Sequence, residues 1–309
     1  MSAPGTAPRG LGDRPYLILA MVMMMWAGNA VAGRLAVGEV SPVALTSLRW
    51  VVVMGVLVVA SGRRIAADLR QLRPRWRYLL AMGALGYTGF NSLMYLAAHS
   101  TTAINIGVIQ GVTPVFVLLG SFLVYRTSVG LLQAVGVAIT IAGVLVVATR
   151  GDVRILQELS FTIGDLWMIV ASAFYAGYTV GLRRRPATSP VAFFAGLATA
   201  AFVSSLPLLA AEAWAGKFVW PTAKGWLVVA YAGLVPSLIS QLLFMRAVTL
   251  IGPGRAGLFI NLLPIFAALL GVAILGETFA PYHAAALALV LAGIGLAEWG
   301  RAAERVQAS

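Results

Sequence analysis

The sequence predicts an all-α integral membrane protein in which ten transmembrane helices form two five-helix repeats of inverted topology. Three observations support this prediction: an apolar composition, ten apolar stretches of spanning length, and a similarity between the two halves of the chain. Of the 309 residues, 60% are hydrophobic and only 10% are charged, where a soluble domain has about a quarter charged. Mean hydropathy is +0.91. So few charges could not cover the surface of a soluble protein of this length.

The apolar stretches are each long enough to cross a bilayer, which takes roughly 20 residues in a helix. The first stretch follows Arg9 and Arg14 as a secretory signal would, but it is too long for a signal core and further spans follow it. The longer loops are 62–75, 149–163 and 212–224. The expected spans are 15–37, 42–61, 76–98, 102–125, 128–148, 164–184, 189–211, 225–248, 254–276 and 281–300.

The basic residues set the expected orientation. With the N-terminus in the cytoplasm, fifteen of the 22 basic residues fall in inner segments and five in outer segments. Arg49 and Arg246 remain within spans. This asymmetry follows the positive-inside rule with both termini cytoplasmic. The formal net charge of +12 is therefore assigned to topology, and no nucleic-acid partner is expected.

The two halves of the chain resemble each other at a shift of about 149 residues. Residues 26–34 read WAGNAVAGR and residues 175–183 read YAGYTVGLR, while SPVA occurs at 41–44 and again at 189–192. Because five helices is an odd number, the second repeat enters the membrane inverted, an architecture that lets a transporter alternate between outward and inward openings. The expected division is a cytoplasmic tail 1–14, a first repeat 15–148, a periplasmic linker 149–163, a second repeat 164–300 and a cytoplasmic tail 301–309.

Polar and aromatic residues concentrate on spans 1, 3, 4, 6, 8 and 9, whereas spans 5, 7 and 10 are mostly small and aliphatic and are expected to face lipid. Polar groups within hydrocarbon need partners, so these faces should point inward. Each residue alone fits hydrogen bonding between helices equally well, but the set favours a shared cavity. The expected substrate-binding residues are Trp26, Asn29, Tyr87, Asn91, Tyr95, Gln110, Tyr175, Tyr178, Ser240, Gln241 and Asn261.

Prolines inside spans 4, 8 and 9 predict interrupted helices, because proline removes a backbone donor and kinks a helix. Pro114 and Pro264 occupy corresponding positions of the two repeats, and paired interruptions indicate a binding site or hinge. Packing alone is the alternative explanation. The expected hinge residues are Gly111, Pro114, Pro236 and Pro264.

Charged and metal-binding chemistry is sparse. The chain has no cysteine and two histidines, so disulfides, thiolate chemistry and a histidine-rich metal centre are not expected, nor are a cofactor or catalytic residues. Asp165 and Glu277 lie near span ends, and His99 at an outer end is expected to be structural. Arg49 is the deepest charge and is expected to snorkel or to bond helix carbonyls. Without a central carboxylate, proton coupling is not favoured.

These features resemble the drug/metabolite transporter superfamily, in particular its EamA-type ten-helix exporters. The similarity rests on the Trp26–Asn29 stretch, on Pro42 followed by Arg49, and on RAVTLIGPGRAGLFINLLPIFAALLGVAILGE between Arg246 and Glu277. Within the superfamily the chain looks most like bacterial exporters of aromatic amino acids. The first half departs from the pattern, with Tyr125-Arg126-Thr127 and no acid where Glu277 has its mate. The resemblance implies a V-shaped central cavity lined by spans 1, 3, 4, 6, 8 and 9.

The expected function is secondary export of aromatic and other neutral amino acids across the bacterial inner membrane, by alternating access and without proton coupling. The expected chain is a multi-pass monomer in the lipid bilayer, and it is not an enzyme. The alternative is an exporter of other small metabolites or drugs, with or without proton coupling; an import carrier also stays open. A cation exporter would need an acid in span 1, a phosphate translocator paired basic residues, and an enzyme a polar cluster at one interface, none of which the sequence offers.

Overall fold

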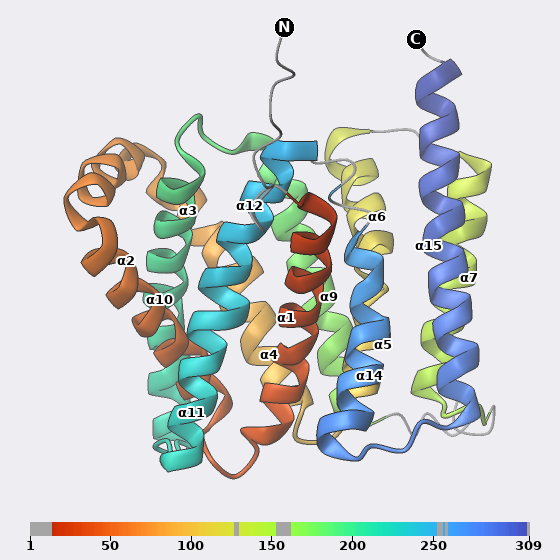
Figure 1. Cartoon of the computed structure of the whole chain (residues 1–309), viewed down its shortest axis with the longest axis horizontal. Coiled ribbons are helices and arrows are strands. Elements are labelled where there is room, and N and C mark those ends of the chain that lie inside the picture. The colour runs from red at the N-terminus through yellow and green to blue at the C-terminus, as the bar shows by residue number, and fades with distance from the viewer. Residues whose placement is uncertain (1–13, 127–129, 153–161, 252–255, 257–258, 308–309) are drawn as a thin grey trace, which may run out of the picture.

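The structure, a computed structural model, describes residues 14–126, 130–152, 162–251, 256 and 259–307, and within these ranges it contains helices and no strand. Helical segments occur at all ten expected spans (Figure 1). Seven described helices are long and apolar enough to cross a membrane, and the shorter apolar helices Phe259–Leu275 and Pro281–Ala297 accompany them. The prediction of an all-α membrane protein is confirmed.

The first half contains α1 (Pro15–Leu35), α2 (Pro42–Leu72), α3 (Trp76–Gly83), the π-helix η3 (Ala84–Gly89), α4 (Phe90–Ala97), α5 (Ala103–Gln110), α6 (Thr113–Tyr125) and α7 (Leu131–Ala148). The second half contains α9 (Ile163–Gly181), α10 (Pro190–Trp214), α11 (Ala223–Ala232), the π-helix η5 (Gly233–Ile239), α12 (Ser240–Ile251), the 3-10 helix η6 (Phe259–Leu262), α14 (Leu263–Leu275) and α15 (Pro281–Gln307).

Local chemistry explains where many helices begin. Proline occupies the first helical turn of α1, α2, α6, α10 and α14, where its missing N–H costs nothing. Thr102, Thr162, Ser189 and Thr222 act as N-caps, each side chain accepting from a backbone N–H three residues on. These caps satisfy backbone donors that have no partner within the helix.

One expected loop is wrong over most of its length. The sequence predicted a loop at 62–75, but α2 continues to Leu72. Leu72 is buried and packs in a hydrophobic cluster with Leu79 and Leu197, so the basic end of α2 has an apolar side that is covered by α3 and α10. Such an amphipathic extension stays helical because its apolar face is buried.

The two halves pack with the symmetry of an inverted repeat. α4 packs against α9 as α12 packs against α1, and α6 packs against α9 as α14 packs against α1. Spans that correspond to each other in the two halves also pack together: α5 of the fourth span contacts α14 of the ninth, and α7 of the fifth contacts α15 of the tenth. α7 and α15 lie next to each other at one side of the bundle (Figure 1). At the α5–α14 crossing, a Cβ on Gly107 would lie 2.2 Å from the Cβ of Ala267, so only glycine permits this close approach.

The expected interruptions occur at matching places in the two halves. The fourth span breaks between α5 and α6, immediately before Pro114, and the ninth changes from a 3-10 helix to α14 immediately before Pro264. The third and eighth spans contain the π-helices η3 and η5 at corresponding positions. π-Helical turns are uncommon and are frequent at functional sites. The inverted repeat thus places four irregular segments inside the bundle.

Candidate functional site

Arg49 lies at the centre of a buried polar cluster. It sits seven residues into the span Pro42–Ala60, about 10 Å along the helix, and only 3% of the residue is exposed. Its Nη1 donates to Oδ1 of Asn91 at 2.6 Å and to the hydroxyl of Tyr95. Its Nε and Nη2 donate to the hydroxyl of Ser237 at 2.9 and 2.5 Å. The guanidinium therefore joins α2 to α4 and to η5.

The irregular backbone of η5 prepares Ser237 for this contact. Pro236 has no N–H, so the carbonyl of Ala232 loses the donor that a regular helix would supply. The hydroxyl of Ser237 donates to that carbonyl at 2.6 Å. Its oxygen lone pairs then remain to accept from Arg49. One proline thus explains both the π-helix and the orientation of a site residue.

Asn29, Asn91 and Tyr95 form the other half of the cluster. The Tyr95 hydroxyl donates to Oδ1 of Asn29 at 2.8 Å, and Nδ2 of Asn29 lies 3.4 Å from Oδ1 of Asn91. Nδ2 of Asn91 donates to the carbonyl of Tyr87 at 2.6 Å, within the π-helical stretch of the third span. The amide oxygens therefore point toward Arg49, and the three residues are all buried.

No carboxylate neutralises this arginine within the described residues. The two salt bridges found there join Arg34 to Glu277 and Lys224 to Glu39. The partners of Arg49 are instead neutral side-chain oxygens and aromatic rings. The expectation that Arg49 snorkels or bonds helix carbonyls is wrong, because side-chain oxygens from three other elements surround it. A buried charge without a counter-ion costs several kcal/mol, and ionisable residues at such depth mark functional sites by default.

A cluster of aromatic rings adjoins the polar cluster. Trp50 stacks on Tyr87 with ring centroids 4.8 Å apart and planes 6° from parallel. Tyr87 contacts Tyr178 at 5.5 Å, and Tyr178 contacts Tyr175 at 5.4 Å. The guanidinium carbon of Arg49 lies 5.4 Å from the centre of the Trp50 ring. The two clusters are therefore adjacent: one offers a fixed cation and the other a set of flat apolar faces.

Trp50 also has an unused donor. Its Nε1 is buried and has no hydrogen-bond partner within the described residues, although a buried indole usually finds one. Sequence reasoning missed Arg49, Trp50 and Ser237 as site residues. The available signal was depth: Arg49 lies too far into its span for an interfacial residue, and no acid on a neighbouring span could pair with it.

The remaining expected site residues lie outside the Arg49 cluster and the aromatic cluster. Trp26 donates from Nε1 to the hydroxyl of Ser240 at 2.7 Å, so these two residues tie α1 to α12. Gln110, Gln241 and Asn261 are only partly buried, and they do not hydrogen-bond to the described residues of the Arg49 cluster. They lie on the interrupted fourth and ninth spans or at the start of α12.

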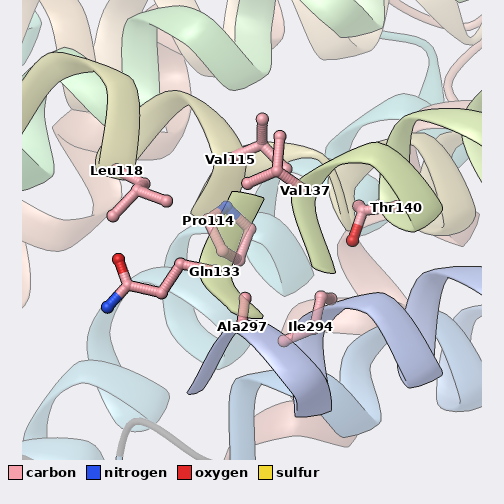
Figure 2. A pocket seen from close by; sticks show the side chains of 8 residues that line it. All are labelled: Pro114, Val115, Leu118, Gln133, Val137, Thr140, Ile294 and Ala297. Atoms are coloured by element: carbon pink, nitrogen blue, oxygen red, sulfur yellow. The ribbon is translucent and has the colours of Figure 1, made fainter. Parts of the chain in front are cut away.

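A small cavity lies away from the Arg49 cluster. Pro114, Val115 and Leu118 of α6 line it together with residues of α7 and α15, and Figure 2 shows Gln133 and Thr140 of α7 beside Pro114. Its volume of about 60 Å³ is room for only a few water molecules. It also involves spans 5 and 10, which were expected only to face lipid. The Arg49 cluster itself is closed in this conformation.

Acidic residues hold the two halves together at the end of the bundle opposite the start of α1. Glu277 follows α14 and accepts from the backbone N–H groups of Ala103 and Ile104, at 2.8 and 3.0 Å. Glu212 of α10 accepts in the same way from Val43 and Ala44 of α2. Each carboxylate caps a helix of the other half, a favourable place for negative charge.

A third carboxylate, Asp165, is only 2% exposed. It accepts from the hydroxyl of Thr101 at 2.6 Å and from that of Thr162. Asn105 links it to His283: Nε2 of His283 lies 3.2 Å from the Asn105 side-chain oxygen, while Nδ1 accepts from the backbone of Ala280. These contacts fix a neutral His283 with the proton on Nε2.

Inverted halves, interrupted helices and a buried polar cluster between them are features of membrane transporters. A model of the EamA-like transporter family matches residues 14–149 and again residues 162–298. The chain therefore belongs to the EamA-like transporter family, and it is a multi-pass membrane transporter that acts on a small molecule.

Known relatives agree with this assignment. The chain is 22% identical over 289 residues to the "Uncharacterized transporter YyaM" of Bacillus subtilis, covering 90% of this chain and 92% of the relative. It is 25% identical over 291 residues to the "Uncharacterized inner membrane transporter YedA" of Escherichia coli, covering 92% and 90%. A solved structure described as "Crystal structure of protein" has the same fold, with a TM-score of 0.64, 21% identity and coverage of 94% and 98%.

Proposed function

We propose that this transporter exports aromatic and other neutral amino acids across the inner membrane by alternating access. The observation that supports this best is the adjacency of Arg49 to the aromatic cluster of Trp50, Tyr87, Tyr175 and Tyr178. An aromatic amino acid has a carboxylate that suits a guanidinium and a ring that suits stacked aromatic faces. The neutral oxygens of Asn29 and Asn91 offer acceptors to its ammonium group.

The proposed orientation places both termini in the cytoplasm. Arg126, Arg183 and Arg184 lie at the end where α1 begins and α15 finishes, whereas Glu39, Glu212 and Glu277 lie at the opposite end. The arginines at the first end support the orientation, because the positive-inside rule counts basic residues. The family match to two separate ranges supports the division into repeats 15–148 and 164–300, and the name of the Escherichia coli relative supports the inner membrane.

We propose facilitated export, because the described residues around Arg49 include no carboxylate to bind a coupling proton. One observation favours the alternative, a proton-coupled exporter of other small metabolites. Asp165 is a buried acid that contacts the first half through Thr101 and Asn105. A proton on Asp165 would replace an accepted hydrogen bond with a donated one and so loosen the contact between the halves.

The direct test is flux in proteoliposomes. Radiolabelled tryptophan, phenylalanine and threonine are offered with and without a proton gradient, and empty liposomes supply the background. Saturable flux without a gradient is the expected result. Flux that requires the gradient and disappears in Asp165→Asn would establish the coupled alternative, and absence of flux for every amino acid would contradict amino-acid export.

The hinge proposal has its own test. Pro114 and Pro264 interrupt corresponding spans, and alanine at either position restores a backbone donor and straightens the helix. We expect Pro114→Ala and Pro264→Ala to lower the transport rate several-fold while substrate affinity changes little. Wild-type rates in both variants would remove the hinge assignment and leave a packing role.

A further inference from the structure

Beyond amino-acid export, we propose that the Arg49 cluster is a site for aromatic carboxylates in general, in which the substrate's carboxylate is required and its amino group is not. This inference rests on the proposed use of the same site for aromatic amino acids. It extends the substrate class to arylalkanoic acids, such as 3-phenylpropionate, that have no ammonium group.

The charge of the site is one-sided. Arg49 supplies a permanent positive charge, and its partners Asn91, Tyr95 and Ser237 are neutral. No acid is salt-bridged to it in the described part of the chain. The described acids Asp165, Glu212 and Glu277 instead cap or join helices at the outer end of the bundle. A bound carboxylate thus gains a counter-ion at this site, whereas an ammonium group gains only neutral acceptors.

The donors that surround the site match a carboxylate. A guanidinium presents parallel N–H groups that suit the two oxygens of a carboxylate. The indole Nε1 of Trp50, whose ring centre lies 5.4 Å from the guanidinium carbon, is buried and has no partner within the described residues. It is a further donor that a ligand oxygen would satisfy. In the closed structure, the oxygens of Asn91, Tyr95 and Ser237 occupy the guanidinium donors in place of such a ligand.

The charge belongs to one repeat only. At the shift of 148 that aligns the two SPVA segments, Arg49 corresponds to Leu197 and Trp50 to Ala198, and both second-repeat residues are buried in an apolar cluster. Inverted symmetry therefore does not explain the arginine. A buried charge that the architecture does not need is costly, which is consistent with retention for a ligand.

The test compares three ligands of one ring size. Purified full-length protein in detergent is titrated with radiolabelled phenylalanine, 3-phenylpropionate, which lacks the ammonium, and phenethylamine, which lacks the carboxylate, with binding read by scintillation proximity. Binding in detergent avoids passive leakage of the neutral ligand forms across a bilayer. We expect 3-phenylpropionate to bind at least as tightly as phenylalanine, and phenethylamine about 10- to 100-fold more weakly, as loss of a charge-assisted contact predicts.

Variants then locate the effect. Arg49→Gln is expected to abolish the preference for carboxylates, and Arg49→Lys to retain part of it because the charge stays while the planar donor group is lost. Arg246→Gln is the matched control, an exposed arginine on α12, and should bind as wild type. The ligand series on wild-type protein decides the proposal even where Arg49→Gln fails to fold.

Three results would overturn the proposal: 3-phenylpropionate binding tenfold more weakly than phenylalanine, phenethylamine binding as tightly as either, or no binding of any ligand. Its failure differs from failure of amino-acid export. Flux of phenylalanine with no binding of 3-phenylpropionate leaves export standing and removes the carboxylate site. Binding of 3-phenylpropionate without flux of any amino acid leaves the carboxylate site standing and removes amino-acid export.

Discussion

Removing the Glu277 carboxylate should destabilise the protein measurably, because that side chain caps α5 across the boundary between the two halves. It is 9% exposed and accepts from two backbone N–H groups, those of Ala103 and Ile104. Hydrogen bonds to a charged acceptor contribute about 1.5–3 kcal/mol each, and the negative charge at a helix N-terminus adds about 0.3–1 kcal/mol. Water reaching the freed N–H groups offsets part of this, so Glu277→Ala should cost about 3 kcal/mol.

The measurement is the apparent melting temperature of purified protein in detergent. At roughly 2 °C per kcal/mol for a chain of this length, Glu277→Ala should melt about 6 °C below wild type. Glu277→Gln keeps one acceptor oxygen and should lose about half as much. Glu39→Gln is the control at the same end of the bundle: its side chain is more exposed, at 25%, and its ion pair with Lys224 is screened by water and contributes little to stability, so it should melt close to wild type. Unchanged melting of both Glu277 variants would refute the capping argument.

Three further changes test other parts of the structure. Gly86→Ala would place a Cβ 2.3 Å from Cγ of Tyr178, whereas the Cβ of the control variant Gly177→Ala would meet nothing closer than 3.6 Å. We expect transport of aromatic substrates to fall several-fold in Gly86→Ala and to be unchanged in Gly177→Ala. Equal transport rates in the two variants would show that the aromatic cluster has no role in transport. Arg126 has a φ of 55° at the end of α6, so Arg126→Gly should stabilise by about 1 kcal/mol in thermal melts, while Arg126→Ala should not. Partial desolvation and the nearby charge of Arg34 lower the pKa of His99 below its ordinary 6.5. The unfolded chain therefore binds the proton more readily, and stability falls as pH drops below about 6.5. If the melting temperature of His99→Gln depended on pH as steeply as that of wild type, this assignment would be contradicted.

Composition and periodicity predicted the large features correctly. An apolar run of spanning length has few options in a bilayer, since only a helix satisfies all of its backbone donors internally, and the helices at all ten expected spans follow from that. The prolines predicted the breaks before Pro114 and Pro264 because a missing N–H acts locally. The basic end of α2 was missed because the apolar cover that keeps it helical comes from α3 and α10.

Part of the Arg49 cluster was anticipated. Asn29, Asn91 and Tyr95 were expected to point inward and line a shared cavity, because polar residues in an apolar medium need partners, and the structure brings the three together; their role in substrate binding stays a prediction. Their shared partner, Arg49, was not anticipated. When one helix is considered alone, only the lipid surface and the helix carbonyls are visible as partners for an arginine, so Arg49 was given one of those roles. Gln110, Gln241 and Asn261 have the same polarity as the cluster residues, but they are only partly buried and lie outside the cluster.

The sequence by itself determined the class of this protein, its spans, its repeat and its interruptions, because each depends on local hydrophobicity or on a missing backbone donor. Only the tertiary structure decided which polar groups surround Arg49, that no described acid neutralises it, and that Glu277 caps a helix of the other half. These are distances between segments far apart in the chain, such as Arg49 and Ser237, 188 residues apart. They depend on how the two halves pack, which no pattern within one helix specifies.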